Sequence, residues 1–321
     1  MTQVCAEWME SGHAEDLIRA ARHYERASQI VISQQINKKK PIGARVCFIP
    51  EFHIVCVLRD WSGGDVHLTW SELDELRDYD NPIAPGALVK TVLLYCQLLD
   101  LTSEESLATQ LKQRYDGGLE VEVWSHLPQG SGLGGSSLLA GTLLSAIVVL
   151  LGHPAPRPSH LIHATLCIEQ WLTTGGGWQD QVGGLVGGGK LGVSSQGTPV
   201  TVSTYNIPLS HTFVTSINQH LLLLYTGKVS KLMTTLQEHC LGMSLAGAGG
   251  GGYLYALKAR PGPLADSVDL GDLTSDCVEV DQEGLELWVA GEAVTRATED
   301  EDVLNHETLM ALLETKNKRF L

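Results

Sequence analysis

One glycine-rich stretch brings together residue types that could bind an anion. It runs Leu127-Pro128-Gln129-Gly130-Ser131-Gly132-Leu133-Gly134-Gly135-Ser136-Ser137 and leads into an apolar segment that predicts a helix over 136–151. Glycine has no Cβ and tolerates positive φ, so the N–H groups of such a loop can converge on one anion. The helix start would add unpaired N–H donors, the positive end of its dipole and two serine hydroxyls. We therefore expect a polyphosphate-binding enzyme.

The residues around the glycine-rich loops exclude two of their common uses, the dinucleotide-binding site and the P-loop. The sequences Gly130-x-Gly132-x-x-Gly135 and Gly247-x-Gly249-x-x-Gly252 both fit the G-x-G-x-x-G pattern of dinucleotide sites. The first loop lacks the acidic residue that such a site needs about 20 residues later, and the second precedes a strand-like segment instead of a helix. No Gly-Lys pair is followed by Ser or Thr, as a P-loop requires. The alternative is that these loops are only tight turns without a ligand. So many glycines would then lower the stability of the fold without a compensating function, which disfavours this alternative.

Composition limits the classes of protein to which the chain could belong. It has 321 residues, of which 43% are hydrophobic and 18% charged, enough for two globular domains with a sizeable core. The net charge of -15 argues against nucleic-acid or anionic-membrane partners. Seven scattered cysteines without a C-x-x-C pair indicate reduced thiols. The N-terminus lacks a signal-peptide pattern and the apolar run 143–151 is too short to span a bilayer, so we expect a cytoplasmic location.

Hydrophobic periodicity predicts an α+β fold, with the elements placed as follows. Helices are expected over 14–36, 86–101, 103–114, 136–151 and 159–173. Strands are expected over 44–49, 53–58, 66–70, 119–124, 221–225 and 253–257, with a hairpin formed by 278–280 and 285–289. The glycine-rich stretch 175–184 is expected to be a turn.

Three motifs in order resemble those of the GHMP small-molecule kinases, which act on galactose, homoserine, mevalonate and phosphomevalonate. The phosphate-binding motif matches Pro128-x-x-x-Gly132-Leu133-Gly134-Gly135-Ser136-Ser137. The catalytic-aspartate segment of the sugar-kinase branch matches Thr173-Thr174-Gly175-Gly176-Gly177-Trp178-Gln179-Asp180-Gln181. The C-terminal glycine motif matches Gly247-Ala248-Gly249-Gly250-Gly251-Gly252, and the segments 41–45 and 124–128 look most like the fucokinase branch.

This resemblance implies a two-lobed GHMP-kinase-like fold. An N-terminal helical segment over 1–40 would precede a lobe over 41–215, a mixed sheet backed by helices that carries the phosphate loop. A reduced α/β sandwich lobe would occupy 216–295, followed by a tail over 296–321.

The resemblance also implies ATP and L-fucose as substrates, with Mg²⁺ as cofactor. Asp180 would be the catalytic base or would orient the anomeric hydroxyl, although it could instead be an ordinary turn aspartate. Ser137 and Glu169 would hold the metal, unless Glu169 is merely a solvated residue near a helix end. The ATP phosphates would contact Pro128, Gly130, Ser131, Gly132, Leu133, Gly134, Gly135, Ser136 and Ser137, together with Gly247, Ala248, Gly249, Gly250 and Gly251.

The chain also departs from the family. The segment R-V-D-F-S-G-G-W-S-D that opens the family's sequences is missing before Pro41, and the similar letters of 59–65 come after the strand and in another order. Only 229–245 fills the place of a long helical insert, and the nucleotidyl-transferase region of the fucokinase relatives is absent. The pattern suggests a shortened form. Two alternatives therefore stay open: an impaired fragment that at most binds ATP, and a kinase for another sugar such as a heptose.

Overall fold

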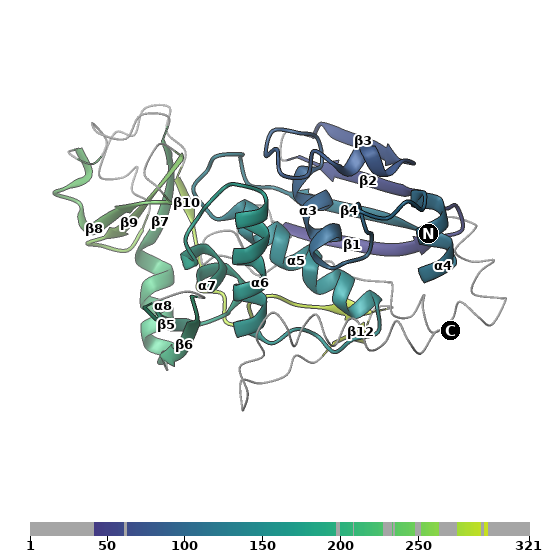
Figure 1. Ribbon diagram of the computed structural model, residues 1–321. Helices are drawn as coiled ribbons and strands as arrows, with labels where there is room; N and C mark the ends of the chain where they lie inside the picture. Colours follow the sequence, from purple (N-terminus) through teal and green to yellow (C-terminus); the bar gives the residue numbers. More distant parts are fainter. Residues whose placement is uncertain are drawn as a thin grey trace.

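A computed structural model describes residues 42–294 of the chain, except for 61–62, 197–199, 208, 227–232, 234, 248–251, 263–274 and 290–291. Within these ranges the two-lobed α+β fold predicted from the sequence is confirmed (Figure 1). The expected helix over 14–36, the tail over 296–321 and the glycine-motif residues Ala248, Gly249, Gly250 and Gly251 lie outside the described residues.

The first lobe is built on a four-stranded sheet in the order β1-β4-β2-β3. Strand β1 (Ile42–Ile49) runs antiparallel to β4 (Gly118–Ser125), which lies parallel to β2 (Ile54–Arg59). A hairpin joins β2 to β3 (Asp65–Trp70). Apolar residues alternate along β1 and bury Ile42, Ala44, Val46 and Phe48, since successive strand side chains point to opposite faces. On the other face the Arg45 guanidinium pairs with the carboxylates of Glu120 and Glu122 across the sheet.

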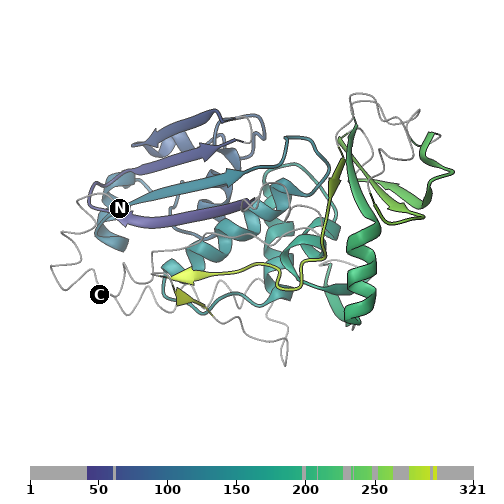
Figure 2. The same ribbon diagram turned by 180° about the vertical axis from the view of Figure 1, so that it is seen from behind.

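Helices cover the apolar face of this sheet (Figures 1 and 2). Helix α5 (Gly135–Leu150) is apolar on nearly all sides and lies buried between the sheet and the outer helices. The outer helices α3 (Ala87–Tyr95), α6 (Pro158–Trp171) and α7 (Gln179–Leu185) pack against α5, whereas α4 (Leu107–Tyr115) packs against β4. A 3-10 turn, η1 (Leu73–Leu76), follows β3. No helix within the described ranges has both the length and the hydrophobicity to cross a membrane.

Two helix boundaries differ from those predicted. Helix α3 ends at Tyr95 instead of residue 101, because Gln97 adopts a left-handed φ of 54° that stops the helix. Helix α4 begins four residues later than predicted, because Ser106 caps it: its Oγ accepts the Thr109 N–H at 3.2 Å. The predicted turn over 175–184 is also corrected, since helix α7 occupies 179–185.

The second lobe is smaller and contains a sheet in the order β10-β7-β9-β8. Its strands are β7 (Leu221–Thr226), β8 (Cys240–Leu245), β9 (Gly252–Lys258) and β10 (Ser275–Cys277), all paired antiparallel. Its separate core consists of Leu222, Leu224, Leu236, Leu254 and Ala256. A hairpin of β5 (Gly189–Ser194) and β6 (Val202–Ile207), followed by α8 (His211–His220), connects the lobes.

After β10 the chain returns to the first lobe (Figure 2). Val278, Leu285 and Leu287 are at most 2% exposed and belong to the large core around the first sheet. The predicted hairpin between 278–280 and 285–289 is wrong: β11 (Trp288–Val289) pairs instead with β12 (Glu292–Ala293). The reason is that the turn after Val280 pairs with another segment: Gly284 forms a bridge with Val186, and the Gly188 N–H donates to the carbonyl oxygen of Asp281 at 2.6 Å. The predicted lobe 216–295 thus contributes residues to the core of the first.

We expect this return to contribute to the stability of the first lobe. Leu287→Ala should lower the free energy of unfolding by about 2–5 kcal/mol, as do other leucine truncations in a packed core. The matched variant Leu241→Ala removes a leucine that is 73% exposed on β8 and should change it by less than about 0.5 kcal/mol. Urea unfolding followed by circular dichroism measures both. Equal losses in the two variants would contradict the packing described.

Candidate active site

Three alternating glycines shape the loop that leads from β4 into α5. Gly130, Gly132 and Gly134 have left-handed φ values of 72°, 75° and 70°, which residues with a Cβ rarely adopt. Gly134 is the N-cap of α5 and offers no side-chain cap, so the first N–H groups of this 16-residue helix are left for another acceptor. The loop therefore presents a helix N-terminus whose first N–H groups lack a side-chain cap, the geometry that an anion-binding site requires.

The second lobe packs directly against this loop. A Cβ on Gly132 would lie 2.6 Å from the carbonyl oxygen of Ala246, and one on Gly247 would lie 2.9 Å from the Cα of Gly132. Beside this contact the Tyr253 N–H donates to the carbonyl oxygen of Ser131 at 3.3 Å. The described ends of the two predicted glycine motifs thus meet in space, although they are more than 100 residues apart.

Three of the predicted site residues converge at the start of α5. The Ser137 hydroxyl donates to Glu169 Oε1 at 2.7 Å, and both side chains are buried. Asp180 lies beside the loop, because a Cβ on Gly134 would be 2.8 Å from the Asp180 Cβ and 3.3 Å from its Oδ1. Helices α5, α6 and α7 therefore bring a hydroxyl and two carboxylates to one place.

A fourth residue of this cluster was not predicted from the sequence. The amide Nε2 of Gln181 donates to Glu169 Oε2 at 2.6 Å, and Gln181 is fully buried. The segment was expected to be a turn, which gives no reason for an inward side chain. The available signal was Val182 and Leu185, three residues apart and both buried, which is the spacing of a helix face that packs inward.

Burial dominates the electrostatics of the two carboxylates. It raises the pKa of Glu169, and the negative charge of Asp180 raises it further, while the hydrogen bonds from Ser137 and Gln181 act in the opposite direction. Burial also raises the pKa of Asp180. Loss of hydration thus disfavours the ionised form of each carboxylate, and the positive charge of a nearby cation would offset that cost.

These residues fit a magnesium ion bound together with a nucleotide. Mg²⁺ prefers oxygen ligands and is commonly held by one or two carboxylates plus phosphate oxygens. Within the described ranges no group of three or more His, Cys, Asp or Glu residues forms a metal site by itself. Glu169 and the Ser137 hydroxyl supply only part of a coordination sphere, which suits an ion that phosphates complete.

The loop, Glu169 and Asp180 line one cleft of about 650 Å³. This is within the usual range of small-molecule sites. The cleft continues to Asp60 and Trp124 at the ends of β2 and β4. Of the predicted nucleotide contacts, Pro128, Gly130, Ser131, Gly132, Gly134, Gly135, Ser136 and Ser137 line it. Leu133 is 1% exposed and belongs to the hydrophobic core, so only its backbone could face a phosphate.

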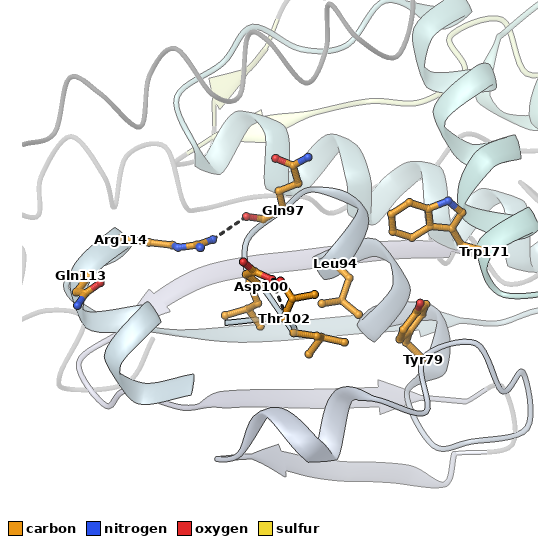
Figure 3. Close-up of a pocket in the computed structure, with 10 residues that line it drawn as sticks. Tyr79, Leu94, Gln97, Asp100, Thr102, Gln113, Arg114 and Trp171 are labelled. Carbon is orange, nitrogen blue, oxygen red and sulfur yellow. Dashed lines mark hydrogen bonds between the residues drawn. The ribbon is translucent and has the colours of Figure 1, made fainter. Parts of the chain in front are cut away.

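A second cavity, of about 710 Å³, lies beside α3 and α4 and contains none of the predicted site residues (Figure 3). Tyr79 and Trp171 lie at one end, and Gln113 and Arg114 at the other. Its polar groups bond within the wall: the Arg114 guanidinium donates to the carbonyl oxygen of Gln97 at 3.1 Å, and Asp100 Oδ1 accepts the Thr102 N–H at 2.8 Å. The cleft at the glycine loop is therefore the candidate active site.

Comparison with known proteins agrees with the fold and with the motifs. Residues 101–188 match the family model described as the GHMP kinases N terminal domain. A D-glycero-D-manno-heptose 1-phosphate kinase from Bacteroides thetaiotaomicron superposes with a TM-score of 0.54 at 13% identity, over 76% of this chain and 85% of that one. A putative sugar kinase from Campylobacter jejuni gives 0.52 at 14% identity, over 77% and 86%. The chain thus has the fold of these kinases, and its residues 101–188 resemble the N-terminal domain of the GHMP kinases.

Curated relatives narrow the resemblance to fucokinases. An L-fucokinase/L-fucose-1-P guanylyltransferase from Bacteroides fragilis is 37% identical over 171 residues, which are 52% of this chain and 18% of that protein. A bifunctional fucokinase/GDP-fucose pyrophosphorylase from Arabidopsis thaliana is 32% identical over 145 residues, 45% of this chain and 13% of that protein. The resemblance to the fucokinase branch is confirmed, and the match spans less than a fifth of either relative.

Because the lobes make contact at Gly132, the loop glycines should differ in how much an alanine substitution destabilises the fold. Alanine at Gly130 or Gly132 must adopt positive φ, which costs about 1–2 kcal/mol at either position. Only at Gly132 does the new Cβ also meet a backbone carbonyl, since nothing lies within 4 Å of a Cβ at Gly130. Gly132→Ala should therefore lower the free energy of unfolding by at least about 1 kcal/mol more than Gly130→Ala. Thermal and urea unfolding measure the difference, and equal losses would mean that the lobes do not meet at Gly132.

Proposed function

We propose that this chain is an ATP-dependent sugar kinase that transfers the γ-phosphate to the anomeric hydroxyl of L-fucose. The observation that carries the proposal is the convergence of Ser137, Glu169 and Asp180 beside a glycine loop at a helix N-terminus. The fold of the solved sugar kinases supports a kinase, and the names of the two curated relatives support L-fucose as acceptor.

Binding of the triphosphate falls to the loop and to the start of α5. Phosphoryl transfer depends mainly on positioning and on charge stabilisation, because the transferred group carries its charge on three equatorial oxygens. The free N–H groups of α5 and its dipole would hold the phosphates in an otherwise acidic chain. Ser137 and Glu169 would hold Mg²⁺, which would neutralise the negative charge of the phosphates.

Asp180 would act on the sugar. Its carboxylate lies beside the phosphate loop, so a hydroxyl bonded to it would face the phosphate. As the new oxygen–phosphorus bond forms and the bond to the ADP oxygen breaks, the hydroxyl proton would pass to Asp180. A carboxylate whose pKa is raised by burial holds that proton better than a solvated one, because base strength follows pKa.

The test of this proposal is ADP release by the purified chain with ATP, Mg²⁺ and L-fucose. Asp180→Asn should lower kcat by about 10²–10⁴-fold, the usual contribution of a general base. The control is Asp116→Asn, at an exposed left-handed position after α4, which asparagine tolerates and which should leave turnover unchanged. Equal turnover by the wild type and Asp180→Asn would contradict the role of Asp180.

The same assay separates the two alternatives. Turnover with a heptose but not with L-fucose would make the chain a kinase of the kind seen in the heptose 1-phosphate kinase, whose fold it shares. ATP binding without turnover on any sugar, unchanged by Asp180→Asn, would identify an impaired fragment.

A further inference from the structure

We propose that Gln181 is a positioning residue that orients the Glu169 carboxylate for the Mg²⁺–nucleotide complex and fixes Asp180 relative to it. The inference rests on the proposed function, since it concerns the same site. It follows from the contacts of Gln181, from its burial and from the packing of α7.

Both oxygens of Glu169 are held, each by a different helix. Ser137 on α5 bonds Oε1 at 2.7 Å, and Gln181 on α7 bonds Oε2 at 2.6 Å. A carboxylate with one bonded oxygen can still rotate about its terminal bond, because that torsion is broad. The second bond removes this freedom, so the lone pairs that remain point in fixed directions.

An amide can donate a hydrogen bond that orients this carboxylate without neutralising its negative charge. A lysine or arginine at position 181 would form an ion pair with Glu169 and compete with any bound cation. The Gln181 amide is neutral and leaves the full negative charge of Glu169 for a metal. In many proteins, residues that hydrogen-bond to a metal ligand orient that ligand and strongly influence metal affinity.

The burial of Gln181 is not explained by stability. Its side chain is fully buried, and its Oε1 has no hydrogen-bond partner among the described residues. A buried acceptor without a partner costs free energy, and an apolar side chain of similar length would avoid that cost. A role in the site accounts for an amide at this position.

Packing of α7 on α5 fixes the reach of Gln181. Leu185, one helical turn after Gln181, lies against Gly141 of α5, where a Cβ would come within 2.7 Å of its Cδ1. Gly184 likewise lies against Leu138 of α5. Because Asp180 precedes Gln181 in the same short helix, the bond to Glu169 also ties Asp180 to the metal ligand.

The test is Mg²⁺ titrated by calorimetry into the full chain saturated with ADP, beside thermal unfolding of each variant. Gln181→Met keeps the length of the side chain but removes the donor, and Gln181→Asn keeps the amide but shortens its reach. Both should weaken Mg²⁺ binding by about 10–100-fold, the usual effect of losing such a partner. The melting temperature of Gln181→Met should fall less than that of a variant that loses only satisfied bonds, because the loss of the donor to Glu169 is offset by removal of the unpartnered Gln181 Oε1.

The matched control is Gln110→Met. Gln110 is also fully buried, but its amide bonds the backbone of Asp100, with Nε2 to the carbonyl oxygen at 2.9 Å and Oε1 from the N–H at 2.8 Å. This variant should lower the melting temperature and leave Mg²⁺ affinity unchanged.

Three results would overturn the inference. If Gln181→Met lowers the melting temperature as Gln110→Met does, with unchanged Mg²⁺ affinity, Gln181 is structural only. If the wild-type chain binds no Mg²⁺ with ADP, the proposed function fails along with the inference. Normal wild-type binding that both Gln181 variants retain would overturn the inference alone.

Discussion

The absence of a side chain at Gly132 is the constraint on which the site depends. There the phosphate loop approaches the backbone of the second lobe so closely that a Cβ would lie 2.6 Å from the carbonyl oxygen of Ala246. The same contact brings Tyr253 to Ser131 and sets the loop from which α5 starts. The glycines of this motif thus allow a loop conformation with positive φ, and they let the two lobes meet at this point.

Charge within the cleft sets its chemistry. Glu169 is buried and Asp180 half-buried; burial raises the pKa of both carboxyl groups, and the charge of Asp180 raises that of Glu169 further, so their ionised forms are destabilised in the free chain. Carboxylates with a raised pKa are common at ligand-binding sites, where the ligand offsets the cost of ionising them. A magnesium–nucleotide complex would do so here. The helix N-terminus, the hydroxyl of Ser137 and the amide of Gln181 provide the neutral part of the site, which binds without cancelling that charge.

Local patterns allowed part of this structure to be predicted. The apolar sequence of α5 and the alternation along β4 identified both elements, and the glycines between them indicated the loop. Helix α7 was missed because its glycines have low helix propensity and its stability comes from packing against α5, which a sequence pattern does not show. The pairing of 278–289 was predicted wrongly because Gly284 forms its bridge with Val186, which lies almost 100 residues earlier in the chain. The proximity of Ser137, Glu169 and Asp180 came from family resemblance and not from periodicity, and Gln181 came from the structure alone.

The most direct test of the account is amide hydrogen exchange of the chain with and without a magnesium complex of a non-hydrolysable ATP analogue. The account predicts slower exchange at the N–H groups of residues 130–137 and at Ala246 and Gly247, because the phosphates bond the loop and tighten its contact with the second lobe. It predicts no change at Gln97 and Thr102, which line the other cavity. Protection at that cavity with none at the glycine loop would contradict the assignment of the site.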